Sequence, residues 1–285
     1  MSFYDFARSQ GVELSRLYPS DKIIRCGTLE KPRSKNGAYF WDGARGWVMD
    51  WSGDARVTWY NDPDAKPWTD QEKRQWALKR QAMSSEKSKS YAEVAQKALE
   101  TLKQAKLASH DYMMTKGLDE QVLVLDNVML VPMRNVATNK IQGYQSITWN
   151  HVERSYDKKM LFGMQAKNAV LMLGNRSGED FWLVEGFATG ISLRNALRSC
   201  GMLDTVVVCF SASNLLNVSD QIKGNKYVFA DHDKSGVGEK TAIDTGLPWV
   251  MADEEGWDAN DLHYHRGLFA VMSKIMKLKS SCKKS

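Results

Sequence analysis

The feature that most constrains the fold is a series of short apolar runs, separated by helix-like segments, between Phe181 and Leu262. Four runs rich in Val, Phe and Tyr fit strands buried on both faces: 181–184, 205–210, 226–230 and 249–251. The intervening segments fit helices at 189–197, 214–222 and 237–245, the last of which Gly246 is placed to end. This alternation predicts right-handed β-α-β crossovers and a parallel sheet, and therefore an α/β fold.

Acidic residues follow the ends of these predicted strands. In chain order they are Glu185, Asp231, Asp233, Asp258 and Asp261. Parallel strands present their carboxyl ends along one edge of a sheet, so the first three acids should project towards one point. Residues 231–261 carry nine acidic residues and two basic ones, and such crowding is unfavourable unless a cation lies among them. Because Mg²⁺ and Mn²⁺ bind carboxylate and water oxygens, the pattern predicts a divalent-metal site; solvated turn and helix-cap acids are the alternative.

Three segments of this region resemble a Toprim domain, the metal-binding module of bacterial-type primases, topoisomerases and some nucleases. They are LVEGFATGISL, VVVCFSASNL and YVFADHDKSGVGEKTA. The chain is most similar to primases encoded by phages and plasmids, strongly over 181–265 and more weakly over 20–55 and 108–175. The resemblance implies a Toprim catalytic domain at 181–265, in which Glu185, Asp231 and Asp233 are catalytic and bind two Mg²⁺ or Mn²⁺ ions. Asp258 and Asp261 fall where related phage primases carry a further acidic cluster, which adds them to the metal ligands.

The N-terminal residues 1–66 are predicted to form a small β-rich unit. Short strand-like runs are broken there by turn signals at Lys35-Asn36-Gly37, Asp42-Gly43 and Ser52-Gly53. Basic and aromatic residues interleave in this unit, which fits a surface for single-stranded template DNA. For most of these aromatic residues, however, packing in the core of a small sheet is the favoured interpretation. In the resembled phage primases, a similar segment takes the place of a zinc-binding template reader.

The cysteines argue against zinc. They lie at positions 26, 200, 209 and 282 and form no C-x-x-C pair, which predicts neither a structural zinc site nor disulfides. The chain departs here from bacterial replicative primases, which are similar in the Toprim region but carry an N-terminal zinc module.

Residues 67–107 are predicted to be a helical connector. The segments Thr69–Glu72 and Ser90–Glu93 both fit capping boxes. The serine-rich stretch 84–90 predicts an exposed break between two helices, and apolar residues recur at helical spacing from Tyr91 to Ala105.

Residues 108–180 are predicted to be a basic α+β subdomain, since 134–167 contains six basic residues and two acidic ones. In the resembled primases, this position holds the subdomain that grips the template and the incoming nucleotide. The resemblance therefore assigns nucleotide and template binding to Lys158, Lys159, Arg154 and Lys167. For each of them a solvated surface charge is the alternative. Gln145 and Trp149 are further candidates, and residues 266–285 are expected to form a C-terminal helix and basic tail.

Composition and missing motifs narrow the function classes. The chain of 285 residues is 43% hydrophobic and 26% charged, as in a soluble globular protein. No apolar run approaches the roughly 20 residues that span a bilayer. With no recognisable signal peptide either, we expect a cytoplasmic protein, in the host cytoplasm if it is phage-encoded. The absence of a G-x-x-x-x-G-K-[ST] loop argues against a fused helicase and predicts a separate replicative helicase as partner.

Together these features predict a DNA primase that joins NTPs into short RNA primers on single-stranded DNA by metal-dependent nucleotidyl transfer, in phage or plasmid replication. Glu185 could be a metal ligand or the general base. A Toprim nuclease, which would use the same acids to activate water, is the main alternative, and the basic 134–167 segment favours the primase. A DNA-binding accessory factor with a vestigial metal site is a third interpretation, which the intact acids disfavour.

Overall fold

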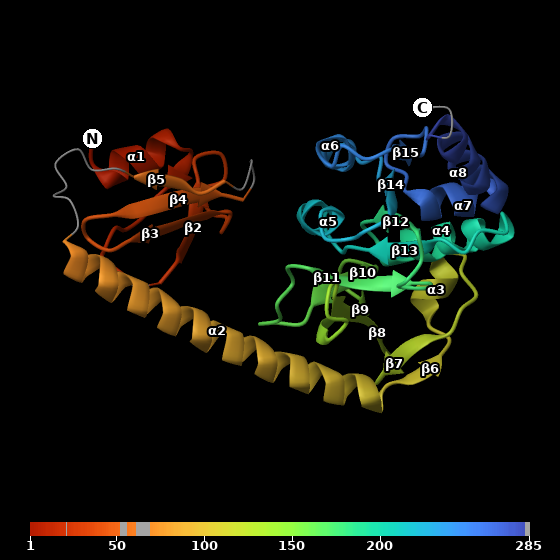
Figure 1. Cartoon of the computed structure of the whole chain (residues 1–285), viewed down its shortest axis with the longest axis horizontal. Coiled ribbons are helices and arrows are strands. Elements are labelled where there is room, and N and C mark those ends of the chain that lie inside the picture. The colour runs from red at the N-terminus through yellow and green to blue at the C-terminus, as the bar shows by residue number, and fades with distance from the viewer. Residues whose placement is uncertain (21, 52–55, 61–68, 283–285) are drawn as a thin grey trace. The chain divides into compact units, whose positions relative to one another are not determined.

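The computed structural model describes residues 1–20, 22–51, 56–60 and 69–282. The chain divides into two compact units, 1–81 and 82–285 (Figure 1). Two expected features lie outside the described residues: the turn at Ser52-Gly53 and the end of the basic tail, 283–285. Among the helices that are described, none combines the length and apolar character that a membrane crossing requires.

The first unit is a five-stranded antiparallel sheet with one helix packed on it. Helix α1 (Phe3–Ser9) precedes strands β1 (Val12–Glu13), β2 (Ile24–Thr28), β3 (Gly37–Trp41), β4 (Gly46–Asp50) and β5 (Thr58–Tyr60), which pair in sequence order. The predicted turns at 35–37 and 42–43 join β2 to β3 and β3 to β4. Helix α1 was not predicted, although Ser2 caps it: the Ser2 side chain accepts a hydrogen bond of 3.2 Å from the Asp5 amide.

Several aromatic residues of this unit form its core. The rings of Tyr39 and Tyr60 lie 6.3 Å and 5.5 Å from the ring of Phe3, measured between centroids. For these two tyrosines, and for the buried Phe40, the core interpretation is confirmed. Trp51 and Trp59 differ, since they are 52% and 57% exposed.

Helix α2 (Asp70–Gln104) is continuous over 35 residues, so the predicted break at 84–90 is wrong. Serine in a helix costs only about 0.5 kcal/mol relative to alanine, and the lysines and glutamate between the serines favour helix. The predicted capping box at the helix start is confirmed, because the Thr69 amide donates to Glu72 Oε2 (2.8 Å) and the Glu72 amide donates to Thr69 Oγ1 (3.2 Å). Ser90 lies inside the helix, so the second predicted box does not form.

The second unit is built on a ten-stranded mixed sheet. Its strands are β6 (Lys106–Ala108), β7 (Val122–Leu125), β8 (Val128–Asn135), β9 (Ile141–Asn150), β10 (Ser155–Met160), β11 (Ala169–Leu173), β12 (Asp180–Val184), β13 (Thr205–Val208), β14 (Asn225–Ala230) and β15 (Trp249–Met251). Its further helices are α3 (Asp111–Thr115), α4 (Phe187–Ser199), α5 (Ala212–Ser219), α6 (Val237–Asp244), α7 (Ala259–Arg266) and α8 (Leu268–Cys282). The main strand order is β10-β9-β8-β11-β13-β12-β14-β15, with β7 beside β8 and β6 beside β7.

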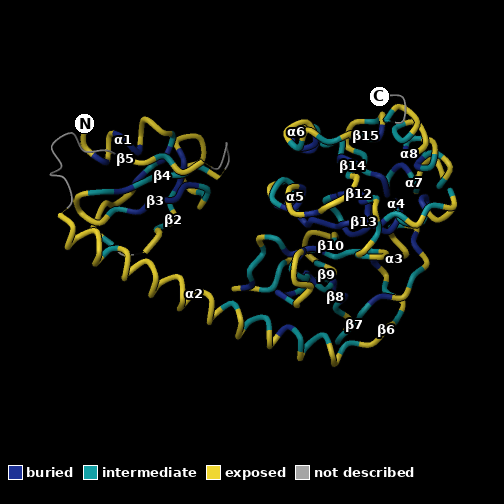
Figure 2. The backbone as a smooth tube through the Cα atoms, viewed as in Figure 1, coloured by how far each residue is buried: buried dark blue, intermediate teal, exposed yellow. Residues whose placement is uncertain are grey.

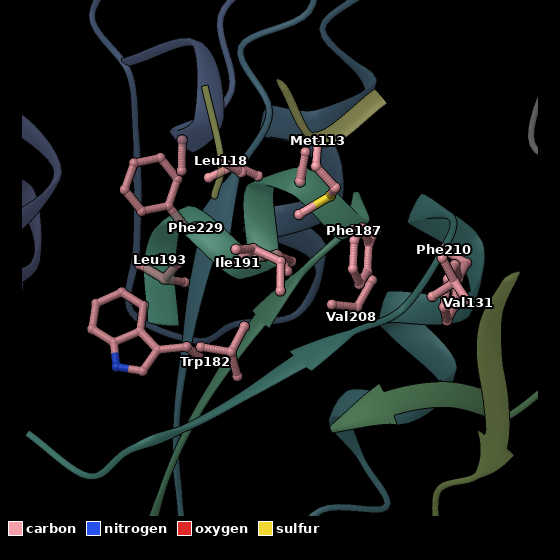
Figure 3. Packing of buried hydrophobic residues seen from close by; sticks show 14 of the residues in the cluster. Met113, Leu118, Val131, Trp182, Phe187, Ile191, Leu193, Val208, Phe210 and Phe229 are labelled. Atoms are coloured by element: carbon pink, nitrogen blue, oxygen red, sulfur yellow. The ribbon is translucent and has the colours of Figure 1, made fainter. Parts of the chain in front are cut away.

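The α/β prediction is confirmed for the half of this sheet formed by β13, β12, β14 and β15, which are all parallel. All four strands and the helices α4, α5 and α6 overlap the predicted segments. Trp182 and Phe229 belong to the core that α4 and α8 cover. Figure 3 shows both side chains near Leu193 of α4. Leu183 and Val228 belong to the core beneath α5 and α6 on the opposite face. Strands β12, β13 and β14 are therefore buried on both faces, whereas β15 at the edge is half-buried (Figure 2).

The antiparallel strands β6 to β10 form the other half of the sheet. The strand-like run at 122–135 is divided into β7 and β8 by a two-residue turn at Asp126-Asn127, both with positive φ (49° and 61°). Strand β11 joins the two halves, because it pairs antiparallel with β8 on one side and with β13 on the other.

A buried ion cluster fixes the amino-terminal end of β12. Lys279 of α8 is 13% exposed and contacts the carboxylates of Asp180 (2.7 Å) and Asp204. The indole N–H of Trp182 donates to the same Asp204 carboxylate at 3.0 Å. This cluster lies at the end of the strand opposite to its acidic residue, Glu185.

Candidate metal and phosphate site

The strand ends bring two of the predicted acids to one edge of the sheet. Strands β12 and β14 are direct neighbours, with Leu183 opposite Val228. Glu185 and Asp231 each follow the last residue of their strand. The backbone at Glu185 is held in place because the Phe210 amide, just past β13, donates to its carbonyl oxygen at 2.9 Å.

Asp231 is in an unfavourable environment for a negative charge. Burial is the largest of the causes that raise its pKa from 3.8 to about 8, and the charges of Asp258, Glu185 and Asp233 raise it further. Its Oδ1 atom is buried and has no hydrogen-bond partner among the described residues. A positive charge placed beside Asp231 would therefore be strongly favoured.

Asp233 has the opposite character. Burial alone would raise its pKa, but hydrogen bonds from Ser235 and from the amides of Gly238 and Val237 outweigh burial and lower it. The Gly238 amide donates to Asp233 Oδ2 at 2.7 Å and the Ser235 amide to Oδ1 at 2.9 Å. A β-carbon on Gly238 would lie 2.1 Å from the Asp231 carbonyl oxygen, so only glycine allows this loop to close. Asp233 is thus an oriented carboxylate whose charge is already stabilised.

Glu185 lies between these two extremes. Burial, followed by the charge of Asp233, raises its pKa, and the ammonium group of Lys158 acts against this rise. Glu185 is only partly buried, so it can reach a ligand at the edge of the sheet.

The predicted ligands Asp258 and Asp261 form the cap of helix α7. Asp258 accepts hydrogen bonds from the Asp261 amide (2.9 Å), the Asn260 amide (2.6 Å) and the Thr189 hydroxyl (2.7 Å). Asp261 accepts in return from the Asp258 amide at 3.2 Å, which completes a capping box. The charge of Asp258 acts on Asp231, while Asp261 lies 3.6 Å from Lys116 Nζ.

The two predicted lysines of β10 differ in their surroundings. Lys158 opposes the raised pKa values of both Glu185 and Asp231, and its Nζ lies 5.4 Å from the ring centroid of Tyr112. Lys159, its neighbour along the strand, points the other way and pairs with Asp157 at 2.7 Å. Lys158 is therefore the lysine that the fold brings to the acids.

The remaining predicted contacts lie elsewhere. Arg154 is exposed in the turn between β9 and β10, and Lys167 lines a groove beside α2. Gln145 is buried, and Trp149 is 45% exposed with its ring 5.1 Å from that of Tyr156.

Sequence reasoning missed two residues that border the acids. Thr189 is fully buried and binds Asp258; its place within the EGFATG segment, four residues after Glu185, was the available signal. Tyr112 of α3 is 1% exposed, and its hydroxyl is buried without a partner among the described residues. Burial raises the pKa of Tyr112 to about 12, so this hydroxyl stays protonated. No local pattern distinguished Tyr112 from an ordinary core tyrosine. His232 Nδ1 donates to the Ala252 carbonyl oxygen (3.1 Å) in the loop before α7, so this ring contacts the loop.

The acids do not form a complete cage for a divalent cation, but they could supply part of its ligands. In the described ranges, no three His, Cys, Asp or Glu side chains stand close enough to form a complete metal cage. Mg²⁺, however, is commonly held by one or two carboxylates together with water and substrate phosphates. The unpartnered Asp231 oxygen, with Glu185 on the adjacent strand end and Asp233 two residues away, provides a donor set of that kind.

No protein-family profile and no curated protein sequence matches the chain. One similar solved structure is that of bacteriophage T7 lagging-strand DNA polymerase interacting with primase domains of two gp4 subunits bound to an RNA/DNA hybrid and dTTP. The matched chain is 13% identical, with a TM-score of 0.39, and the match covers 61% of this chain and 91% of that one. A second is the DnaG catalytic core, 13% identical with a TM-score of 0.37, where the match covers 53% of this chain and 52% of the other.

Proposed function

We propose that this protein is a DNA primase, which joins NTPs into short RNA primers on single-stranded DNA in phage or plasmid replication. The observation that carries the proposal is the position of Glu185 and Asp231 at adjacent parallel strand ends, where the charge of Lys158 acts on both. The Toprim-like sequence motifs, which include both acids and Asp233, support it. A separate replicative helicase and a cytoplasmic location are parts of the same proposal.

In this proposal, Glu185, Asp231 and Asp233 would hold Mg²⁺ or Mn²⁺, with two ions expected and Asp258 and Asp261 bordering them. A bound divalent ion lowers the pKa of an attacking hydroxyl and neutralises charge on a triphosphate. Asp233 would contribute a fixed carboxylate, because four hydrogen bonds from its own loop hold it in place. Asp231 would ionise only as the positive charge arrives. Glu185, with its raised pKa, could bind the ion or accept the proton of the 3′-hydroxyl.

Lys158 distinguishes this proposal from the nuclease alternative. A lysine held near the metal-binding acids can neutralise the phosphates of an incoming NTP, which a hydrolytic enzyme does not bind. Arg154, Lys159 and Lys167 are weaker candidates for phosphate contacts in the catalytic centre, because the fold brings none of them to the acids in the way that it brings Lys158.

The test is primer synthesis on single-stranded DNA with labelled NTPs and Mg²⁺ or Mn²⁺. The wild type should make short oligoribonucleotides, and Asp231→Ala and Glu185→Ala should abolish them. Lys158→Ala should reduce synthesis by about 10²-fold, the scale expected for one lost transition-state contact. Lys159→Ala, which removes the adjacent lysine paired with Asp157, is the matched control and should retain activity. Shortened DNA without labelled RNA would favour the nuclease and refute the primase.

A further inference from the structure

A groove of about 880 Å³ lies in the second unit, between helix α2 and the end of the antiparallel sheet. Its basic residues come from four separate places: Lys87 on α2, Arg134 at the end of β8, Lys140 in the following turn and Lys167 before β11. Among the described residues that line it, none is acidic. A cleft whose charged lining residues are all cations concentrates the electrostatic field and attracts anions.

Helix α2 separates its charges between two faces. The residues that line the groove, from Ser84 to Leu99, recur at intervals of three and four and therefore occupy one side of the helix. The acids of this part of the helix, Glu86, Glu93 and Glu100, recur every seven residues. At 100° per residue, they lie on the opposite side from the groove. The positive character of the groove is thus not neutralised by its own helix.

One buried group in the groove lacks a partner. Gln142 of β9 is 7% exposed and lines the groove. Its amide nitrogen donates to the Lys167 carbonyl oxygen at 3.4 Å, which leaves Oε1 as an acceptor without a donor. That oxygen is buried and has no partner among the described residues, a condition that native proteins rarely leave uncorrected. Phosphate groups only accept hydrogen bonds, so a ligand that reaches this oxygen would have to carry N–H or O–H donors.

These features together describe a ligand with repeated phosphates and polar bases. The helical residues from Ser84 to Leu99 extend over about 22 Å, at 1.5 Å per residue, which exceeds the length of one nucleotide. Tyr91 lies on the same side of the helix, and the ammonium group of Lys87 lies 5.5 Å from its ring centroid, so that cation and ring together form one contact surface for a nucleotide. We infer that this groove binds a segment of single-stranded nucleic acid, with Lys87, Arg134, Lys140 and Lys167 at its phosphates and Gln142 at a base. The inference rests on the proposed function only in identifying that strand as the template.

The test is binding of the full chain to a fluorescent 20-nucleotide single strand, measured by anisotropy in EDTA, where no metal-dependent step takes place. The double variant Lys87→Ala/Lys140→Ala removes two groove cations. Losing two phosphate contacts on a single strand should lower the slope of log affinity against log salt concentration by about 1.4. Between 50 and 200 mM salt, the fold-decrease in affinity should then be about seven times smaller for the variant than for the wild type. The control pair Lys97→Ala/Lys223→Ala removes two exposed lysines outside the groove and should leave the slope unchanged.

Gln142→Leu gives an independent readout. The change removes a buried acceptor that has no donor, and with it the 3.4 Å bond to the Lys167 carbonyl oxygen, so the melting temperature should change little while affinity for the strand falls about tenfold. Equal affinity in the wild type and both groove variants would overturn the inference, and so would an equal loss in the control pair. Variant-sensitive binding of ATP or inorganic phosphate, with unaltered binding of the strand, would assign the groove to a free phosphate ligand instead. If groove-dependent binding persists while primer synthesis is absent, the proposed function fails and the groove assignment stands.

Discussion

Replacing Asp231 by Asn should make the metal-free protein more stable, and the gain should grow with pH. Its pKa of about 8 in the folded protein, against 3.8, means that the folded state binds this proton more tightly than the unfolded chain. Stability is then highest at acid pH and falls as the pH rises from about 4 to about 8. Between pH 3.8 and pH 7, Asp231 is ionised in the unfolded chain but still mostly protonated in the folded one. The free energy of unfolding therefore falls by 1.36 kcal/mol per pH unit, which amounts to about 4 kcal/mol at pH 7.

The assay is thermal unfolding of wild type and Asp231→Asn in EDTA at pH 5, 7 and 8. A gain of about 4 kcal/mol at pH 7 corresponds to roughly 8–16 °C in a unit of this size. The stability of the variant should also change much less between pH 5 and pH 8 than that of the wild type. Added Mg²⁺ should stabilise the wild type above pH 7 and have little effect on the variant.

Asp253→Asn is the matched control. Asp253 is an exposed aspartate whose pKa is lowered by its hydrogen bond and charge contact with Lys274, so its replacement should stabilise nothing. If Asp231→Asn is no more stable than the wild type at pH 8, or keeps the same pH dependence, the buried-charge reasoning for this site is refuted.

Three further changes test other parts of the structure. Gly238→Ala should lower the free energy of unfolding by more than about 2 kcal/mol in urea, because its β-carbon would lie 2.1 Å from a backbone oxygen. Gly236→Ala, with open space around its β-carbon, should cost only about 1 kcal/mol for its left-handed φ. Equal costs for the two variants would contradict this view of the loop. Lys279→Met removes the cation that bridges two carboxylates, of which Asp204 is 9% exposed, and should cost about 3 kcal/mol, again by urea unfolding, while a neutral result would show that the cluster is dispensable. Thr69→Ala should destabilise the start of α2 by about 1 kcal/mol, seen as faster amide hydrogen exchange confined to its first turn, and unchanged exchange there would argue against the cap.

The sequence was most informative where one physical constraint acts on a whole segment. Strands buried on both faces must be apolar throughout, so β12, β13 and β14 stood out as continuous apolar runs, and the half-buried β15 did so too. Their parallel arrangement then placed Glu185 and Asp231 at one edge without any knowledge of tertiary contacts. The confirmed capping box of α2 is a similar case, since both partners lie within one turn.

Predictions failed where the outcome depends on weak local preferences or on distant contacts. The serines of α2 disfavour helix too little to interrupt 35 residues, so the predicted break did not form. The difference between Lys158 and Lys159 follows from strand alternation, which required the register of β10 to be known. Tyr112 reaches the acids only through tertiary packing, since α3 precedes Glu185 by about 70 residues in the sequence.

Strand β11 has a consequence for how the second unit could be divided. It belongs to the segment 108–180, assigned to the basic subdomain, yet it forms main-chain pairs with both β8 and β13. A cut at residue 180 would leave β11 with one bare side and expose the edge of β13, a parallel strand whose four residues are all buried. Exposed apolar edges of this kind promote aggregation. The acid-bearing and lysine-bearing halves should therefore be insoluble when produced separately, and soluble only as one chain.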